Sequence, residues 1–349
     1  MTISDRVWVQ LLISDRVVHN LSEGLVKLAT AMHQNKDIDL HTGSEGPCLE
    51  SLTYRSRDHL MTLLQNLCDE MQYDPGRILI HTGNPIESVQ SKFKINRCNT
   101  AEGWFYGDYL SQINVDHNKK FTHHFGNFVS NSTYPRLLLA SYLHKKHEDK
   151  TWQTYRRDPC NPGQAVDLDL DKLMFECADK YVLHQVAEFV KHLPIDLEPG
   201  LPEHPGVDTD IEGRGNGAMG MTILSWYNKF FCDIVNETFF TGHTFFPTEK
   251  TTRPLLCMNP FVVHGPIHYL KRLRHLGFQT FSKFWNEDYD NLQGYARCKS
   301  IYKVIDYIAE QDINKMYEEM KPILEHNRKT LLELDGHKYE NLIADRLST

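Results

Sequence analysis

Short apolar stretches with polar ends alternate along this chain with amphipathic helical patterns, and this alternation limits the fold more than any other feature. After residue 120, FTHHFGNFVSNS is typical of a strand, TYPRLLLASYLHKKH of a helix and KTWQTYRR of a second strand. Pro135 suits the first turn of that helix, and the His and Lys residues suit its last turn. Strands that alternate with helices predict an α/β fold with parallel sheets.

The same alternation occurs on both sides of this region. Residues 50–73 space apolar side chains three and four apart, which predicts a helix, and RILIHTGN after the break at 74–76 predicts a strand. Later in the chain we expect helices at 171–193, 251–257, 267–278 and 299–335, and strands at 233–237 and 260–265. We therefore predict two α/β domains that face each other across a cleft, at 1–118 and 119–310, and a helical extension at 311–349.

Composition narrows the class of protein. The 349 residues are 40% hydrophobic and 24% charged, as in soluble globular proteins, and are enough for two cores. No apolar run approaches about 18 residues, and we expect neither a membrane span nor a signal peptide. Eight cysteines without a CxxC pair favour a reducing compartment, so we expect a cytoplasmic protein. The net charge of −8 disfavours DNA as the main partner, although a local basic groove would still allow it.

The stretch FFPTEKTTRPLLCMNPFVVHGP, residues 245–266, concentrates charge where a strand is expected to end and a helix to begin. Ligands bind at that edge of open α/β sheets, and a helix N-terminus favours an anion. Lys250 and Arg253 would suit a diphosphate, and Glu249 could accept hydrogen bonds from a ribose diol. A helix cap with an exposed ion pair between Glu249 and Arg253 is the alternative, and spacing alone favours it.

A second polar helix start lies in NFVSNSTYPR, residues 127–136. Ser130 or Asn131 near a helix start is ordinary capping. Arg136 is less ordinary, because the helix dipole disfavours a cation in the first turn unless an anion lies nearby. Two basic helix starts in one domain therefore predict an anion-binding site.

These two stretches resemble the α1,3-fucosyltransferases. NFVSNSTYPRLLLASYL is similar to the start of that family's nucleotide domain, in which an Arg opens a helix after a strand that ends in Ser-Asn. VNETFFTGHTFFPTEKTTRPLLCMNPFVVHGP is similar to its nucleotide-sugar motif, in which an acidic, Asn-rich strand end precedes Thr-Glu-Lys, a helix and a strand that finishes in Gly-Pro or Gly-Ser. The similarity spans about residues 120–270.

The resemblance implies a GT-B fold of two Rossmann-like domains, with the acceptor on the side of residues 1–118. It implies a metal-independent glycosyltransferase with a nucleotide-sugar donor, GDP-sugar being favoured over UDP-sugar. Glu249 would contact the ribose, and Lys250 and Arg136 the diphosphate. The other residues that we assign to the donor site are Ser130, Asn131, Glu237, Thr248 and Arg253.

The chain departs from the family at the catalytic carboxylate, a Glu that follows Tyr/Phe-Thr-Gly. The matching stretch LIHTGNPIES has Asn84 at that place and Glu87 three residues later. An amide cannot act as the general base that an inverting transfer needs. Glu87 is one candidate for the base, although it also suits a first-turn helix acid that stabilises the dipole; another residue or a different mechanism is the alternative.

Three functional hypotheses follow. The first is a glycosyltransferase that acts on a glycan or a small-molecule acceptor. TRPLL, YLKRLRHLGFQTF and FWNEDYDN resemble glycosyltransferases of phages and large viruses, so we expect a divergent branch of the family. A viral enzyme of this kind would act in the host cytoplasm. The second is a non-catalytic nucleotide-sugar-binding protein on the same fold. The third is a DNA-base-modifying enzyme, whose DNA would contact Lys271, Arg272 and Arg274, although a solvated helix face explains these residues equally well.

Other polar motifs have simpler explanations. Asp167, Asp169 and Asp171 offer an Asp-x-Asp metal motif but precede a helix, where an acidic cap is commoner. His144 and His147 compensate a helix dipole at its C-terminus. We expect no metal site. The segment 195–220 is rich in Pro, Gly and Asp, which is typical of a lid, a binding loop or a disordered insertion. Its stretch EGRGNGAMG could form a mobile loop over the acceptor.

Overall fold

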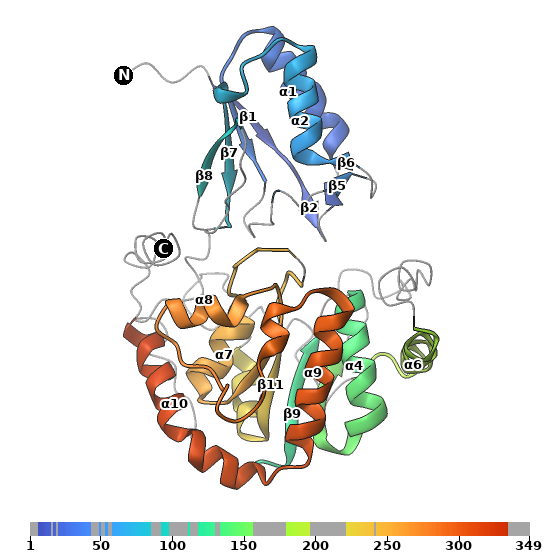
Figure 1. The fold of residues 1–349 in the computed structure, drawn as a ribbon, viewed down its shortest axis with the longest axis vertical. Helices are drawn as coiled ribbons and strands as arrows, with labels where there is room; N and C mark the ends of the chain where they lie inside the picture. The colour runs from blue at the N-terminus through green and yellow to red at the C-terminus, as the bar shows by residue number, and fades with distance from the viewer. Residues whose placement is uncertain are drawn as a thin grey trace. The chain divides into compact units, whose positions relative to one another are not determined.

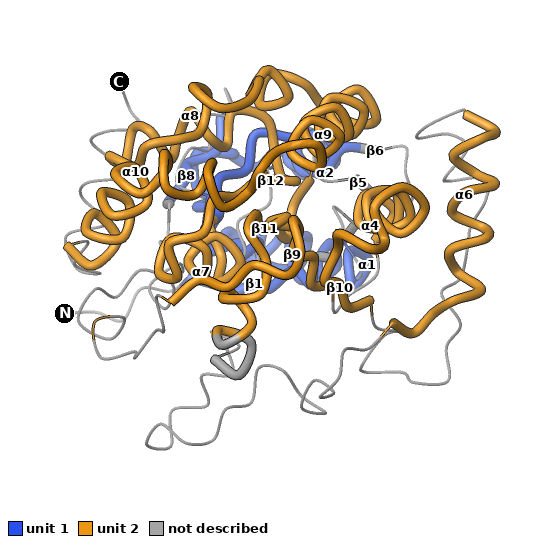
Figure 2. The backbone as a smooth tube through the Cα atoms, turned by 90° about the horizontal axis from the view of Figure 1, so that it is seen from below, with its two compact units in different colours: residues 1–102, 242–246, 340–349 blue, residues 103–241, 247–339 orange. Residues whose placement is uncertain are grey.

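The structure is a computed structural model of the chain. It describes residues 6–14, 17–18, 20–42, 49, 53–54, 58–84, 92–97, 111, 118–129, 133–155, 179–195, 221–240 and 242–333. The chain forms two compact units (Figure 2), of which unit 1 comprises residues 1–102, 242–246 and 340–349 and unit 2 comprises residues 103–241 and 247–339. Within the described ranges, no helix has both the length and the apolar character that crossing a membrane requires.

Unit 1 is built on a parallel sheet with the strand order β1-β4-β7-β8. Its strands and helices are β1 (Val7–Gln10), α1 (Leu21–His33), β4 (Ile38–His41), α2 (Leu60–Glu70), η2 (Pro75–Arg77), β7 (Ile78–Thr82) and β8 (Lys94–Arg97). A second small sheet joins β2 (Ile13–Ser14), β3 (Val17–Val18), β5 (Thr53–Tyr54) and β6 (Asp58–His59) in that order.

One face of the parallel sheet of unit 1 is apolar and packs on both helices. Alternate strand residues such as Val9, Leu40 and Ile80 share a buried core with Leu28 of α1 and Leu64 of α2. Figure 1 shows the two helices side by side on this face. The sequence prediction of a helix from residue 50 is wrong at its start, because β5 and β6 form an antiparallel pair there and the apolar helical repeat begins only at residue 60.

Unit 2 is built on a second parallel sheet, with the order β10-β9-β11-β12. Its elements are β9 (His123–Val129), α4 (Tyr134–His147), η4 (Glu148–Lys150), β10 (Thr151–Tyr155), α6 (Lys180–Val190), η6 (Met221–Asn228), β11 (Phe230–Asn236), α7 (Glu249–Cys257), β12 (Phe261–His264), α8 (Tyr269–His275), η7 (Asp288–Asn291), α9 (Gly294–Ala309) and α10 (Ile313–Glu333). The predicted α/β fold with parallel sheets is confirmed.

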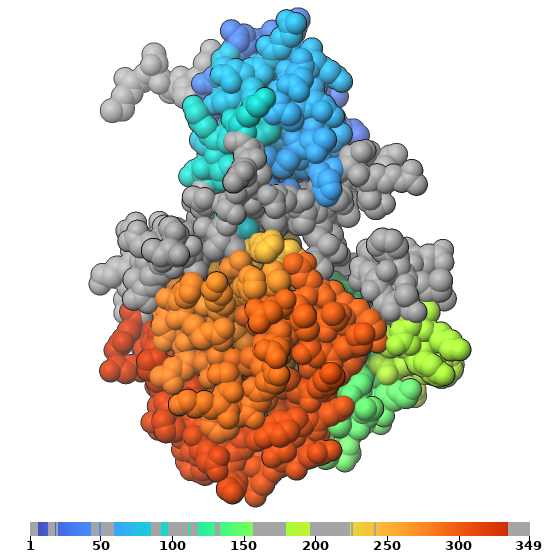
Figure 3. All heavy atoms as spheres, viewed as in Figure 1, coloured from blue at the N-terminus to red at the C-terminus, as the bar shows by residue number. Residues whose placement is uncertain are grey.

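The sheet of unit 2 is buried on both faces. Every residue of β11 and β12 is buried, as expected for strands of a parallel sheet that is covered on both sides. α9 contacts α4 and β12, whereas α7 contacts β11 and α10. On the side drawn in Figure 3, the residues that follow β12 form most of the surface of unit 2. Because helices cover both faces of this sheet, the carboxyl ends of its strands are where polar side chains can gather.

Lys119 lies just before β9 and is hydrogen-bonded to the ends of η6 and α7. Its Nζ donates to the main-chain oxygens of Tyr227 (3.2 Å) and Cys257 (2.6 Å) and to Oδ1 of Asn259 (2.8 Å). We expect Lys119→Ala to lower the free energy of unfolding by about 2 kcal/mol, because hydrogen bonds of a charged donor are lost and buried acceptors are left unpaired. Urea denaturation measures the loss. The exposed neighbour Lys120 is the matched control, and an equal effect of Lys120→Ala would contradict the prediction.

Candidate functional site

The candidate site lies at the carboxyl end of β11 and the N-terminus of α7. β11 ends at Asn236, and Glu237 follows it; α7 begins at Glu249, and the side chain of Thr248 caps it by accepting a hydrogen bond from the Lys250 amide at 3.3 Å. The strand, helix and strand predicted around this stretch are all present. The predicted charges therefore lie at the sheet edge where open α/β folds bind ligands.

Glu237 anchors the beginning of α7. Its side chain is buried, with 3% of the residue exposed. Its carboxylate accepts hydrogen bonds from the amide (3.2 Å) and hydroxyl (2.7 Å) of Thr248, the hydroxyl of Thr251 (2.5 Å) and the hydroxyl of Tyr269 (2.8 Å). Two donors from Thr248, the cap of α7, one from α7 and one from α8 thus fix the end of β11. In this arrangement Glu237 holds the residues that begin α7 in place. A direct contact of Glu237 with a donor nucleotide stays a prediction.

Glu249, Lys250 and Arg253 form a mostly buried ion-pair cluster. Oε1 of Glu249 lies 2.9 Å from Nζ of Lys250 and 3.3 Å from Nη2 of Arg253, and the three side chains are 16%, 21% and 11% exposed. Burial raises the pKa of Glu249, but the two cations outweigh it and hold the pKa below its usual value. The ion pair that spacing alone favoured is present, although it is not exposed. The first turn of α7 thus carries two cations and one carboxylate, and anion binding there stays a prediction.

Arg136, in the first turn of α4, lies at the same strand end. It is 7% exposed, and its Nη2 donates to the main-chain oxygens of Glu237 (2.9 Å) and Asn236 (3.3 Å). Glu237 therefore contacts both predicted helix starts, Arg136 of α4 and Thr248 of α7. The structure brings together six predicted residues, namely Arg136, Glu237, Thr248, Glu249, Lys250 and Arg253. Ser130 and Asn131 lie outside the described residues.

Asn84, the position that matches the catalytic carboxylate of the family, has a structural contact in unit 1. It is 1% exposed, and its Oδ1 accepts a hydrogen bond from the main-chain N–H of Phe245 at 3.3 Å. Its own N–H donates to the hydroxyl of Thr82 at 3.2 Å. The side chain thus holds the segment 242–246, which belongs to unit 1. Glu87, the alternative base, lies outside the described residues.

A row of buried polar side chains behind the site was not predicted. Nδ2 of Asn127 donates to Oε1 of Gln153 (3.0 Å), Nδ2 of Asn236 donates to Oδ1 of Asn127 (2.6 Å), and Oδ1 of Asn236 lies 2.9 Å from Nδ1 of His264. Burial lowers the pKa of His264 well below its usual value, and the charges of Arg297 and Arg136 lower it further. The neutral His264 donates through Nδ1. Polar residues on each of the four strands were the sequence signal for this row.

In the described part of the chain, no group of three His, Cys, Asp or Glu residues is placed to hold a metal ion, and the expected absence of a metal stays a prediction. His144 and His147 lie beside carboxylates, at 3.2 Å from Glu148 and 2.8 Å from Asp306. The Asp-x-Asp motif at 167–171 lies outside the described residues, and so does most of the predicted loop at 195–220.

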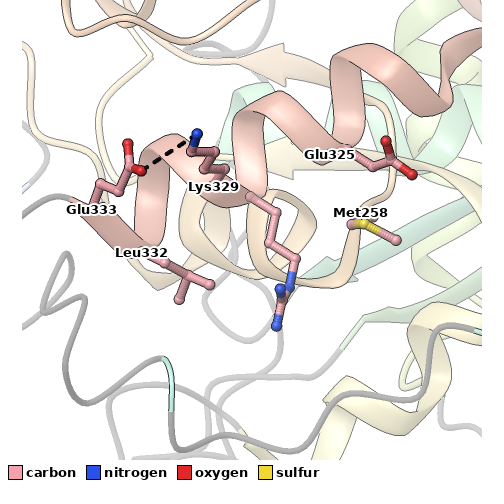
Figure 4. Close-up of a pocket in the computed structure, with 6 residues that line it drawn as sticks. Met258, Glu325, Lys329, Leu332 and Glu333 are labelled. Atoms are coloured by element: carbon pink, nitrogen blue, oxygen red, sulfur yellow. Dashed lines mark ion pairs between the residues drawn. The ribbon is translucent and has the colours of Figure 1, made fainter.

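A pocket of about 380 Å³ lies at the opposite end of α7 (Figure 4). It is lined by Met258, Glu325, Arg328, Lys329, Leu332 and Glu333. Lys329 and Glu333 form an ion pair of 3.8 Å beside it. None of the predicted site residues lines this pocket, so it is separate from the candidate site.

Comparisons with protein-family models, with curated proteins and with solved structures gave no match to this chain.

Proposed function

We propose that this chain is a metal-independent glycosyltransferase of GT-B architecture that takes its sugar from a nucleotide-sugar donor, with a GDP-sugar favoured. The observation that carries the proposal is the N-terminus of α7, where Lys250 and Arg253 surround Glu249 at the carboxyl edge of a parallel sheet. The resemblance of the Thr-Glu-Lys stretch and of the start of α4 to α1,3-fucosyltransferases supports the same conclusion.

In the proposed reaction the donor diphosphate lies against the first turn of α7. Lys250, Arg253 and the N-terminal amides of the helix then stabilise the negative charge that develops on the departing nucleotide. Phosphate oxygens would compete with Glu249 for the two cations, which would release its carboxylate to accept hydrogen bonds from the ribose. An inverting transfer also needs a group that takes the proton of the acceptor hydroxyl, and Glu87 is our candidate for it.

One observation favours a second candidate, a nucleotide-sugar-binding protein without transferase activity. Asn84 is buried and already accepts a hydrogen bond from Phe245, so the side chain at the matching catalytic position holds the backbone. The DNA hypothesis gains no such support, because both arginines that it assigns to DNA have contacts within the chain. Arg272 donates to the main-chain oxygen of Ile267 at 2.9 Å, and Arg274 pairs with Glu287 at 3.3 Å.

Nucleotide binding tests the proposal directly. In a thermal-shift screen with GDP, UDP, CMP and dTDP, we expect GDP to raise the melting temperature most, because a ligand that binds only the folded state stabilises it. Lys250→Ala should weaken the binding of that nucleotide at least about tenfold by calorimetry, since a charge-assisted contact of roughly 1.5–3 kcal/mol is lost. Lys303→Ala, an exposed lysine of α9, should bind normally.

Two results would decide between the candidates or reject both. Unchanged nucleotide binding by Lys250→Ala would place the site elsewhere. Nucleotide-sugar binding with no hydrolysis or transfer to a panel of acceptors would favour the non-catalytic protein.

A further inference from the structure

The second face of the parallel sheet in unit 1 carries polar and aromatic side chains. Successive strand residues point to opposite faces, and Val9, Leu40 and Ile80 take the buried face with α1 and α2. The residues between them form what we call the Trp8 face, which consists of Trp8, Gln10, Asp39, His41, Leu79, His81, Lys94 and Asn96. Parallel sheets are usually apolar on both faces, so a polar face with an exposed tryptophan points to a binding role.

Three rings of this face form one stack across three strands. The ring centroids of Trp8 and His41 are 3.3 Å apart, and those of His41 and His81 are 4.0 Å apart with an interplanar angle of 6°. The indole of Trp8 nevertheless leaves 62% of the residue exposed. One side of the indole is therefore supported by protein, and much of the rest is open to a ligand.

Hydrogen bonds fix the stack from its inner end. Nδ1 of His81 lies 3.0 Å from Nδ2 of Asn96, and Nε2 of His81 lies 3.1 Å from Oδ1 of Asp39. The Asn96 amide can only donate through Nδ2, so His81 accepts at Nδ1 and donates from Nε2 to Asp39. Asp39 in turn accepts from Nε of Arg6 at 2.9 Å. A ring held in this way loses little further freedom when a ligand binds to it.

Most of the charges on and beside the Trp8 face are paired. Arg6 pairs with Asp39 at 2.9 Å and with Asp37 at 3.3 Å, and Arg77 also pairs with Asp37 at 2.7 Å. Burial is the main cause that lowers the pKa of His41 to about 4, so His41 is neutral at physiological pH. With most of its charges paired and, among its described residues, a single exposed lysine, Lys94, this surface suits a neutral polar ligand and offers a polyanion such as nucleic acid little net attraction.

We propose that the Trp8 face binds a neutral oligosaccharide by stacking a sugar ring on the indole of Trp8. A pyranose presents C–H groups on one side, which the negative face of an indole attracts, and hydroxyl groups at its edge, which side chains such as Gln10 and Asp39 can bind. That this saccharide is the acceptor of the transfer reaction rests on the proposed function; the binding itself does not.

The test uses the full chain and the neutral sugars lactose, maltose, cellobiose and N,N′,N″-triacetylchitotriose. Saturation-transfer NMR detects binding, and a titration gives Kd. We expect at least one of these sugars to bind, Trp8→Ala to weaken it at least tenfold, and Trp8→Phe to retain most of the affinity because a ring remains. Val26→Ala on α1 and Tyr181→Ala on α6, which remove exposed side chains elsewhere, should bind as the wild type does.

Three outcomes would overturn the inference: no binding of any of the four sugars, equal binding by Trp8→Ala, or Trp8-dependent binding of a single-stranded oligonucleotide without sugar binding. The two proposals fail separately. A chain that binds a nucleotide through Lys250 but no sugar refutes the Trp8 proposal alone. Sugar binding that depends on Trp8, with no nucleotide binding, refutes the proposed function alone.

Discussion

Glu237→Ala is expected to lower the free energy of unfolding by about 3–5 kcal/mol, more than any other single change in the candidate site. The substitution leaves four donors of Thr248, Thr251 and Tyr269 without their acceptor in a buried environment. An unsatisfied buried donor costs about 1–3 kcal/mol, and the four losses will not add fully because hydroxyl groups can rotate toward other acceptors. The beginning of α7 would lose its attachment to β11.

Urea denaturation of three variants separates this effect from a general loss of charge. Glu237→Gln keeps one oxygen but turns an amide N–H₂ group toward a donor, so we expect a loss between those of the wild type and Glu237→Ala. Glu325→Ala removes an exposed glutamate of α10 and should change stability by less than about 0.5 kcal/mol. A Glu237→Ala variant within about 1 kcal/mol of the wild type would show that the network is dispensable.

The sequence predicts the elements of unit 2 better than those of unit 1, for a physical reason. β11 and β12 are mostly apolar and end in polar residues, β9 is seven residues long, and the helices between them have long repeats. In unit 1, β1 and β4 are only four residues long and mix polar with apolar side chains, so no strand was predicted there. The helix expected from residue 50 begins ten residues later for a similar reason, because polar residues such as Arg55, Arg57 and Asp58 precede its apolar repeat.

In the candidate site, the sequence predicts contacts between residues close in the chain but not contacts between distant ones. Glu249 and Arg253 meet because they are one helical turn apart, and the sequence alone gives that ion pair. The contact of Arg136 with Glu237 joins residues 101 positions apart, and it depends on β9 and β11 being neighbours in the sheet. The Trp8 stack likewise depends on the register of β1, β4 and β7. Strand order and register between distant segments cannot be derived from hydrophobic periodicity.

A large pH effect is expected at Asp233, in the middle of β11. The residue is 4% exposed, and the hydroxyl of Tyr227 donates to its Oδ2 at 2.6 Å. Burial raises the pKa of Asp233 to about 7, although Tyr227 and Arg253 oppose the shift; the charge of Glu237 adds to it. The ordinary value is 3.8. Between these two values the folded chain keeps a proton that the unfolded chain has released, so stability falls as the pH rises from about 4 to about 7.

Asp233→Asn isolates this contribution, because asparagine keeps the size of the side chain and an oxygen for Tyr227 but never ionises. We expect the variant to match the wild type near pH 4 and to exceed its free energy of unfolding by about 2–4 kcal/mol at pH 8. Urea denaturation of both proteins at several pH values measures the difference, in which the titration of all other groups cancels. A difference that stays constant between pH 4 and pH 8 would mean that Asp233 is ionised throughout this range. The charge of Arg253 would then outweigh the burial of the carboxylate.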